Sequence, residues 1–190
     1  MKKYILLIVL FSQFTLSYSQ EKLEREYRIK ESEVSAKALQ YVESNFEGVR
    51  MKWYGEENLD GKAIEAKGKR DGKLYSLKFS TDGDLQDIEM VVSFNSIPEN
   101  VRNAVEKNLE NRFSRFRIQK TQIQWVGDAA ELAALIRGEK IAGKYATNYE
   151  ITLQGTKDRR TDYYEVLADY KGEIIRESRI VQRTNQNLIY

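Results

Sequence analysis

GKLYSLKFSTDGDLQDIEMVVSF, residues 72–94, is the stretch that decides the fold of this 190-residue chain. In its first half the apolar residues Tyr75, Leu77 and Phe79 alternate with polar ones, the period-2 pattern of a strand with one buried face. Asp82-Gly83 then supplies the positive φ angles that a tight hairpin turn needs. The stretch therefore predicts two antiparallel strands, with Leu77 and Phe79 in the core beneath a helix.

The residues upstream of this hairpin predict one helix and two further strands. Ser32 can cap a helix that runs to about Phe46, because apolar residues fall on one stripe at helical spacing. Alternating patterns then predict strands at residues 49–54 and 62–70, so this unit is a helix followed by four antiparallel strands. The charged stretch 21–31 fits a solvated helix or a short strand, and the strand is favoured.

The same order of elements recurs downstream. Ser96 can cap a second helix, with Pro98 in its first turn, where a missing N–H is tolerated. Strands are predicted at residues 116–126, 145–154, 162–170 and 173–181, and the last turn carries Lys171-Gly172. This ordered recurrence indicates an internal duplication.

One segment, residues 127–143, has no counterpart in the first unit. Its centre, rich in Ala and Leu, predicts a short helix that Asp128 caps and that ends before Gly138.

These elements predict an α+β fold of two tandem repeats, each a helix plus four antiparallel strands, that form one broad sheet with the helices on one face. The first repeat spans residues 20–95, and the second spans residues 96–190 with the insertion 127–143. The other face of the sheet is expected to be open to solvent.

Residues 1–19 have the pattern of a secretory signal peptide. Lys2 and Lys3 form a positive n-region, an apolar run follows, and the small residues Ser17 and Ser19 precede Gln20. The run is interrupted by polar residues and is too short for a membrane anchor. We therefore expect a periplasmic or secreted chain that begins at Gln20 and has no lipobox cysteine and no transmembrane segment.

Composition excludes several kinds of chemistry. The chain has no cysteine and no histidine, so it lacks disulfides, a thiolate nucleophile and the commonest zinc ligands. Glu56, Glu57 and Asp60 are interpreted as solvating a loop, and the acidic run after Asp82 lacks the spacing of a calcium loop. No catalytic residue, cofactor or metal is predicted, and the chain is not expected to be an enzyme.

Positions that alternate with the apolar stripes define a candidate contact surface on the open face. They are mainly basic in the first repeat and acidic in the second, although without Lys2 and Lys3 the chain has 29 basic and 29 acidic residues. A neutral chain is not attracted to nucleic acid. The candidate partner-binding residues are Arg50, Lys52, Tyr54, Lys67, Lys78, Glu150, Tyr163 and Glu165.

Several short motifs resemble the PepSY-like family, also described as beta-lactamase-inhibitor-like. They are the helix starts Glu33-Val34-Ser35-Ala36 and Ser96-Ile97-Pro98-Glu99, the strand Lys52-Trp53-Tyr54, and Lys73-Leu74-Tyr75-Ser76-Leu77-Lys78-Phe79 before Asp82-Gly83. The chain departs from the family pattern with Ser35 where a proline is usual. The resemblance implies an exported protein, repeats of one helix and a curved antiparallel sheet, no catalytic residues, and binding to another protein.

Three functions follow, in order of preference. The first is a non-enzymatic exported module that binds or regulates an unknown envelope or secreted protein through the open sheet face. The alternative is a structural or scaffold module that acts through its edge strands or through oligomerisation. A hydrolase based on carboxylates is the least favoured.

Overall fold

The computed structural model describes residues 20–22, 25–58, 61–139 and 143–181, so the predicted signal peptide lies outside the described residues. Three α-helices occupy the described part of the chain: α1 (Ala36–Asn45), α2 (Glu99–Arg112) and α3 (Ala129–Ile136). The strands are β1 (Gln20–Lys22), β2 (Arg25–Arg28), β3 (Lys52–Asn58), β4 (Gly61–Arg70), β5 (Lys73–Ser80), β6 (Leu85–Val92), β7 (Arg115–Gly127), β8 (Tyr145–Lys157), β9 (Arg160–Ala168) and β10 (Ile174–Ile180). The α+β class is therefore confirmed.

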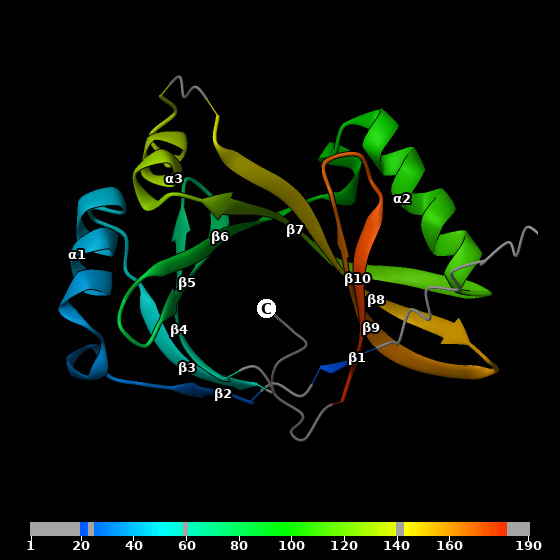
Figure 1. Ribbon diagram of the computed structural model, residues 1–190, viewed down its shortest axis with the longest axis horizontal. Coiled ribbons are helices and arrows are strands. Elements are labelled where there is room, and N and C mark those ends of the chain that lie inside the picture. Colours follow the sequence, from blue (N-terminus) through cyan, green and yellow to red (C-terminus); the bar gives the residue numbers. More distant parts are fainter. Residues whose placement is uncertain (1–19, 23–24, 59–60, 140–142, 182–190) are drawn as a thin grey trace, which may run out of the picture.

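The strands form one ten-stranded sheet in the order β1-β10-β9-β8-β7-β6-β5-β4-β3-β2. From β2 to β10 each strand pairs antiparallel with the next along the chain, whereas β1 pairs parallel with β10. The sheet bends into an arch, and all three helices lie on its outer, convex side (Figure 1). The expectation of one antiparallel sheet with helices on one face is therefore correct, and none of the helices in the described residues lies on the concave face.

The two edges of the sheet lie close together. β1 ends at Lys22 on one edge and β2 begins at Arg25 on the other, only three peptide units further along the chain. Consecutive Cα atoms are about 3.8 Å apart, so the Cα atoms of these two residues are separated by about 11 Å at most. The sheet must therefore curve almost back on itself, and side chains from distant strands approach one another on its concave face.

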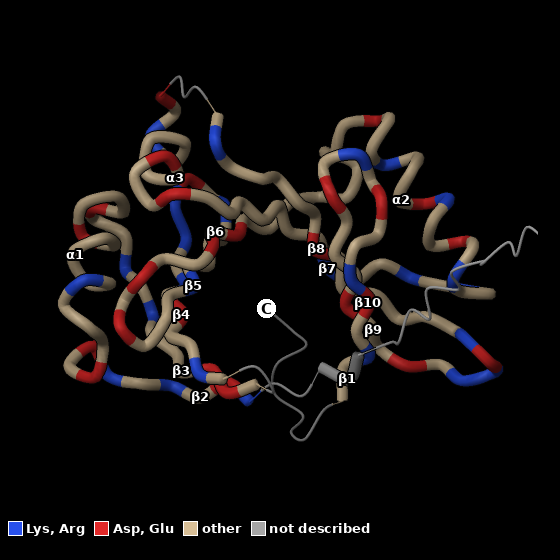
Figure 2. The backbone as a smooth tube through the Cα atoms, in the orientation of Figure 1, with Lys and Arg blue, Asp and Glu red and all other residues tan. Residues whose placement is uncertain are grey.

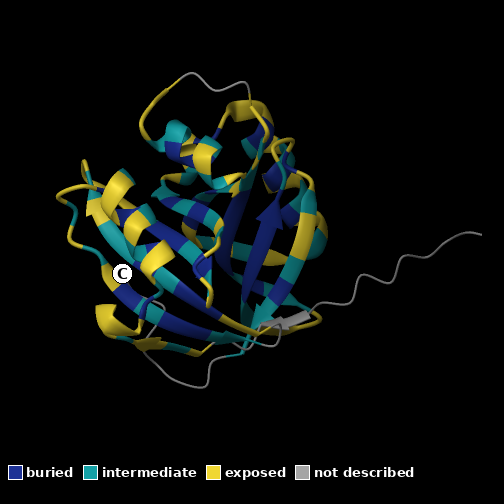
Figure 3. Cartoon of the chain, turned by 60° about the vertical axis from the view of Figure 1, so that its left-hand side comes forward, coloured by how far each residue is buried: buried dark blue, intermediate teal, exposed yellow. Residues whose placement is uncertain are grey.

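The hairpin of residues 72–94 forms as the sequence predicts. β5 pairs antiparallel with β6, and Leu77 and Phe79 are fully buried on the convex side. The rings of Phe79 and Tyr41 of α1 lie 5.9 Å apart, edge to face. At the turn only Gly83, with φ +89°, has the positive φ predicted for Asp82-Gly83. The burial of these strands beneath the helices is seen in Figure 3.

Both long helices begin later than the sequence suggests. Ser35, rather than Ser32, caps α1, because its side-chain oxygen accepts a hydrogen bond from the backbone N–H of Ala38. Ser32 lies instead in a 3-10 turn, Glu31–Glu33. Ser96 likewise ends a 3-10 turn, and α2 starts directly after Pro98. An extended residue, Val34 or Ile97, separates each of these 3-10 turns from its helix, so neither Ser32 nor Ser96 can offer its oxygen to the first helical turn.

The helix predicted within residues 127–143 has the expected ends, but it packs in an unexpected place. Asp128 caps α3, and Gly138 follows it with φ +74°. The fully buried side chain of Leu132 belongs to the same apolar cluster as Phe79 and Trp53. α3 therefore completes the core beneath α1, although it comes from the second half of the chain. A separate cluster around Val105 and Ile151 lies beneath α2.

The glycine of the β5–β6 turn is required by a close approach as well as by its backbone angle. A Cβ on Gly83 would lie 3.0 Å from the backbone nitrogen of Ala38 and would overlap the Ser35 side chain, so Gly83→Ala must push the turn away from α1. We expect Gly83→Ala to lower the free energy of unfolding by about 2–3 kcal/mol, from backbone strain and overpacking together.

Gly72→Ala is the matched control, because Gly72 has φ +79° but nothing within 4 Å of an added Cβ. It should lose only about 1 kcal/mol in urea denaturation, the strain contribution alone. Equal losses for the two variants would show that the turn does not press on the helix.

Candidate functional site

The concave face of the sheet is defined by the residues that alternate with the core. Trp53, Ala66, Leu77 and Ile88 stand side by side on four neighbouring strands and are all buried on the convex side. The residues between them therefore point to the concave side. Figure 2 shows the charged positions of three neighbouring strands: both signs occur on β4, only basic residues on β5 and only acidic residues on β6.

Seven of the eight predicted contact residues lie on this face. In the first half they are Lys52 and Tyr54 on β3, Lys67 on β4 and Lys78 on β5; in the second half they are Glu150 on β8 and Tyr163 and Glu165 on β9. Arg50 lies before the start of β3, outside the sheet. The structure therefore brings the predicted residues onto one surface, apart from Arg50.

The expectation that this face is open to solvent is wrong for its centre. Several of its polar side chains are buried, because the curvature of the sheet brings opposite strands together: Ser76, Gln122, Gln124, Glu150, Thr152, Glu165 and Ser178. The interpretation of Glu56 as a residue that solvates a loop is also wrong. It lies on β3, is 2% exposed, and accepts hydrogen bonds from Lys78 and Asn58. Glu57 is on the same strand, and Asp60 is outside the described residues.

The lysines of the concave face are held by carboxylates. The Lys67 ammonium lies 2.6 Å from Glu26 and 3.0 Å from Glu65, and the Lys78 ammonium lies 2.6 Å from Glu56. Burial alone would lower the pKa of Lys67, but Glu65 and Glu26 raise it above its usual value. Lys67 therefore stays charged, and the ion pairs of both lysines neutralise this part of the face rather than leaving a bare basic patch.

The central feature of the face was not predicted from the sequence. Asp87 and Glu89 on β6 point to the concave side next to Gln122 and Gln124 on β7. The Gln122 amide nitrogen donates to Glu89 at 2.6 Å, and that of Gln124 donates to Asp87 at 3.3 Å and to Glu89 at 3.4 Å. With Glu65 of β4 these residues form what we call the acidic centre. One sequence signal for this feature was available: Asp87 and Glu89 alternate with Ile88 and Met90, which places both carboxylates on the face opposite the core.

Both carboxyl groups on β6 resist ionisation. Burial, with a smaller contribution from neighbouring carboxylates, raises the pKa of Asp87 to about 7 and that of Glu89 to about 8. A half-buried carboxylate is costly unless a cation balances it. The acidic centre is therefore the part of the face where a positive charge would be most favourable.

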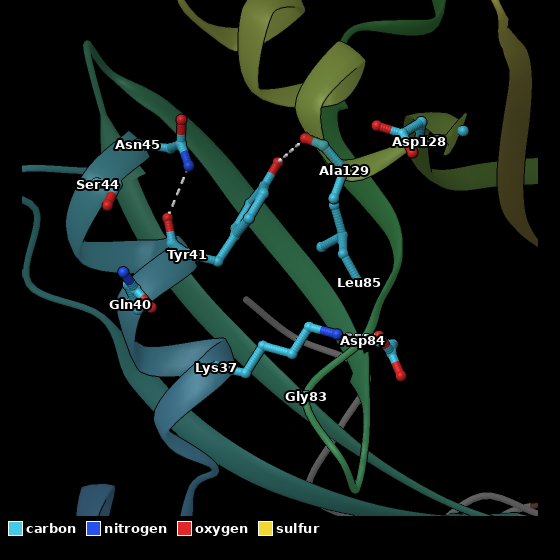
Figure 4. Close-up of a pocket in the computed structure, with 11 residues that line it drawn as sticks. Lys37, Gln40, Tyr41, Ser44, Asn45, Gly83, Asp84, Leu85, Asp128 and Ala129 are labelled. Carbon is cyan, nitrogen blue, oxygen red and sulfur yellow. Dashed lines mark hydrogen bonds and ion pairs between the residues drawn. The ribbon is translucent and has the colours of Figure 1, made fainter.

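A second concavity lies on the outside of the fold, between α1, the β5–β6 turn and the start of α3 (Figure 4). It has a volume of about 600 Å³. The Tyr41 hydroxyl donates to the Ala129 carbonyl across it, and Lys37 forms an ion pair with Asp84. Burial raises the pKa of Tyr41 to about 12, so this hydroxyl remains a donor. These contacts join α1 to α3, and we assign the concavity a structural role.

Within the described residues, no group of three or more Asp or Glu side chains is arranged to hold a metal ion. In the same part of the chain, none of the helices is both long and apolar enough to cross a membrane.

The fold and this face together define a class of protein: an α+β module with an arched antiparallel sheet whose helices, within the described residues, all lie on the convex side. No protein-family model matches the sequence, and neither does any curated protein. The fold is similar to that of a BLIP-like protein from Bacteroides fragilis NCTC 9343, with a TM-score of 0.50 and 13% identity over 81% of this chain and 91% of that one.

Two further solved structures align less closely. A DUF2874 family protein from Bacteroides ovatus ATCC 8483 has a TM-score of 0.49 and 11% identity, over 77% of this chain and 87% of its own. A protein described as periplasmic, from Bacteroides eggerthii DSM 20697, has a TM-score of 0.46 and 13% identity, over 77% of this chain and 88% of its own. The inhibitor-like part of the sequence resemblance is thus supported as a likeness of fold, and the PepSY-like part stays a prediction.

Proposed function

We propose that this chain is an exported, non-enzymatic binding module of the PepSY-like or beta-lactamase-inhibitor-like kind. In this proposal its two halves arose by duplication, and the concave sheet face contacts another protein of the envelope or of the extracellular space. The observation that supports the proposal is that seven of the eight residues predicted for the contact surface lie on that one face. The signal-peptide pattern and the fold likeness to a BLIP-like protein support it.

The edge strands argue against the scaffold alternative. A module that assembles through its sheet edges needs long uncovered strands, whose backbone N–H and C=O groups can pair with another chain. Here the edges are β1, with 3 residues, and β2, with 4 residues. Short edges are a common protection against such pairing, so the face is the better candidate surface.

Affinity capture of the exported chain from its own envelope extract, with mass spectrometry, would first provide a partner. The decisive comparison is then between a variant of the concave face and a variant of exposed residues elsewhere on the protein. Lys52→Glu with Tyr54→Ala changes the rim of the concave face, and Lys107→Glu with Tyr170→Ala changes exposed residues elsewhere. We expect the first pair to weaken binding of the identified partner by at least about tenfold and the second to leave it unchanged. The reverse pattern would refute the proposal.

Salt dependence gives a second readout of the same proposal. A face with interleaved charges steers a complementary partner, so the association rate constant should fall as ionic strength rises. Lys67 and Lys78 are unsuitable for charge reversal, because Lys67 pairs with the half-buried Glu26 and Lys78 pairs with the buried Glu56, so reversal would destabilise the fold. Lys52 is exposed and avoids this problem.

A further inference from the structure

The acidic centre has more hydrogen-bond acceptors than donors. Both donating side chains, the amides of Gln122 and Gln124, already give their N–H groups to Asp87 and Glu89. Two neighbouring lysines pair with carboxylates other than Asp87 and Glu89: Lys67 with Glu26 and Glu65, and Lys78 with Glu56. Among the described residues, no lysine or arginine forms an ion pair with Asp87 or Glu89. Among the described residues the carboxylate oxygens of Asp87 and Glu89 therefore have no lysine or arginine ion-pair partner, whereas Glu65 pairs with Lys67.

An oxygen beside the cluster that lacks a hydrogen-bond partner also indicates that a donor would bind here. Gln122 is only 4% exposed, and its side-chain carbonyl oxygen is buried without a hydrogen-bond partner in the described structure. Its amide nitrogen donates to Glu89, so the end of this side chain lies against the acidic centre. A buried acceptor that lacks a partner costs about 1–3 kcal/mol, so a donor that reaches this oxygen would be stabilised.

The chemistry that fits is a planar cation with several N–H groups. A guanidinium has five donors in a fixed fork and matches carboxylate pairs, whereas an ammonium offers a single point of charge. A metal ion fits poorly, because no metal-binding group of carboxylates is present in the described part of the chain. An anion would be repelled by Glu65, Asp87 and Glu89.

We propose that the acidic centre binds an arginine side chain of the partner protein, with Asp87 and Glu89 accepting from the guanidinium and the carbonyl oxygen of Gln122 accepting a further N–H. This inference rests on the proposed function, in which the concave face is the contact surface. It gives the partner a stated chemistry: a protruding arginine that enters the middle of the arch.

The titration of Asp87 and Glu89 predicts how arginine binding depends on pH. Burial raises the pKa of Asp87 and of Glu89, and the guanidinium prefers their ionised forms, so arginine binding should tighten as pH rises from about 6 to 8. The other charged groups that act on these two carboxyls come from six strands: Glu56, Glu65, Lys78, Lys120, Glu150 and Glu165. Lys78 lowers the pKa of Asp87 and Lys120 lowers that of Glu89, whereas the carboxylates raise both pKa values.

The test uses the whole exported chain and two small probes. Nα-acetyl-arginine N-methylamide is titrated into the protein, and Nα-acetyl-citrulline N-methylamide serves as its neutral isostere. The side-chain amide resonances of Gln122 and Gln124 report binding at the centre by NMR. We expect millimolar binding of the arginine probe, at least about tenfold weaker binding of the citrulline probe, and tighter arginine binding at higher pH.

Glu89→Gln should weaken arginine binding at least about tenfold, because it removes a charge and keeps the shape. Glu43→Gln, an exposed position on α1, is the control and should bind like the wild type. Equal binding of the two probes, or full binding by Glu89→Gln, would overturn the inference.

These outcomes are separable from those of the proposed function. If the arginine probe does not bind while Lys52→Glu with Tyr54→Ala still abolishes partner binding, the arginine site is refuted and the concave face is retained as the contact surface. If the probe binds at the acidic centre while that pair of substitutions leaves partner binding intact, the proposed function falls and the arginine site remains.

Discussion

Phe79→Ala is expected to lower the free energy of unfolding by about 3–5 kcal/mol, the range for large-to-small substitutions in a well-packed core. Phe79 is fully buried at the centre of the first apolar cluster. Its ring lies 5.9 Å from that of Tyr41 on α1 and 6.1 Å from that of Trp53 on β3. Because helix and sheet meet at this side chain, the surroundings cannot collapse to fill the cavity without separating the two layers.

Leu74→Ala on the same strand is the control. Leu74 is 41% exposed, so its truncation should change stability by no more than about 0.5 kcal/mol. Urea denaturation followed by circular dichroism measures both variants. A midpoint for Phe79→Ala equal to that of the wild type would mean that the two faces of β5 have been assigned the wrong way round.

Local patterns sufficed to predict most of this fold. The alternation through Leu77 and Phe79 decides which face of β5 is buried, because neighbouring side chains on a strand point in opposite directions. Gly83 marks the turn for an equally local reason, its positive φ. The start of α1 was less predictable, since Ser32 and Ser35 are both suitable caps and only the path of the chain decides between them. β1 is too short to have a pattern.

The acidic centre could not be predicted in the same way. Gln122 and Gln124 lie more than thirty residues from Glu89 along the chain, and only the pairing of β6 with β7 brings them together. The burial of Glu56 depends on the curvature of the sheet, which a period-2 pattern does not encode. Alternation assigns a side chain to a face, but the shape of that face decides whether the side chain meets solvent.

Stability should fall as pH rises from about 4 to 8, and the acidic centre should be the main cause. Burial raises the pKa of Asp87 from 3.8 to about 7 and that of Glu89 from 4.5 to about 8. In this window the folded chain binds more protons than the unfolded chain, so raising the pH favours unfolding. A lowered carboxyl pKa would have the opposite effect.

Asp87→Asn combined with Glu89→Gln removes both titrations while keeping the shape of the side chains. At about pH 9 the double variant should be more stable than the wild type by about 2–4 kcal/mol, less than the full conversion at 1.36 kcal/mol per pKa unit because both groups keep some contact with water. At about pH 4, where both carboxyls are protonated in the folded wild type, the difference should nearly vanish. Urea denaturation at both pH values, with Glu43→Gln as the exposed control, measures it. A double variant that tracks the wild type at both pH values would show that these carboxylates are ionised without penalty, and the need for a cation at the centre of the arch would disappear with it.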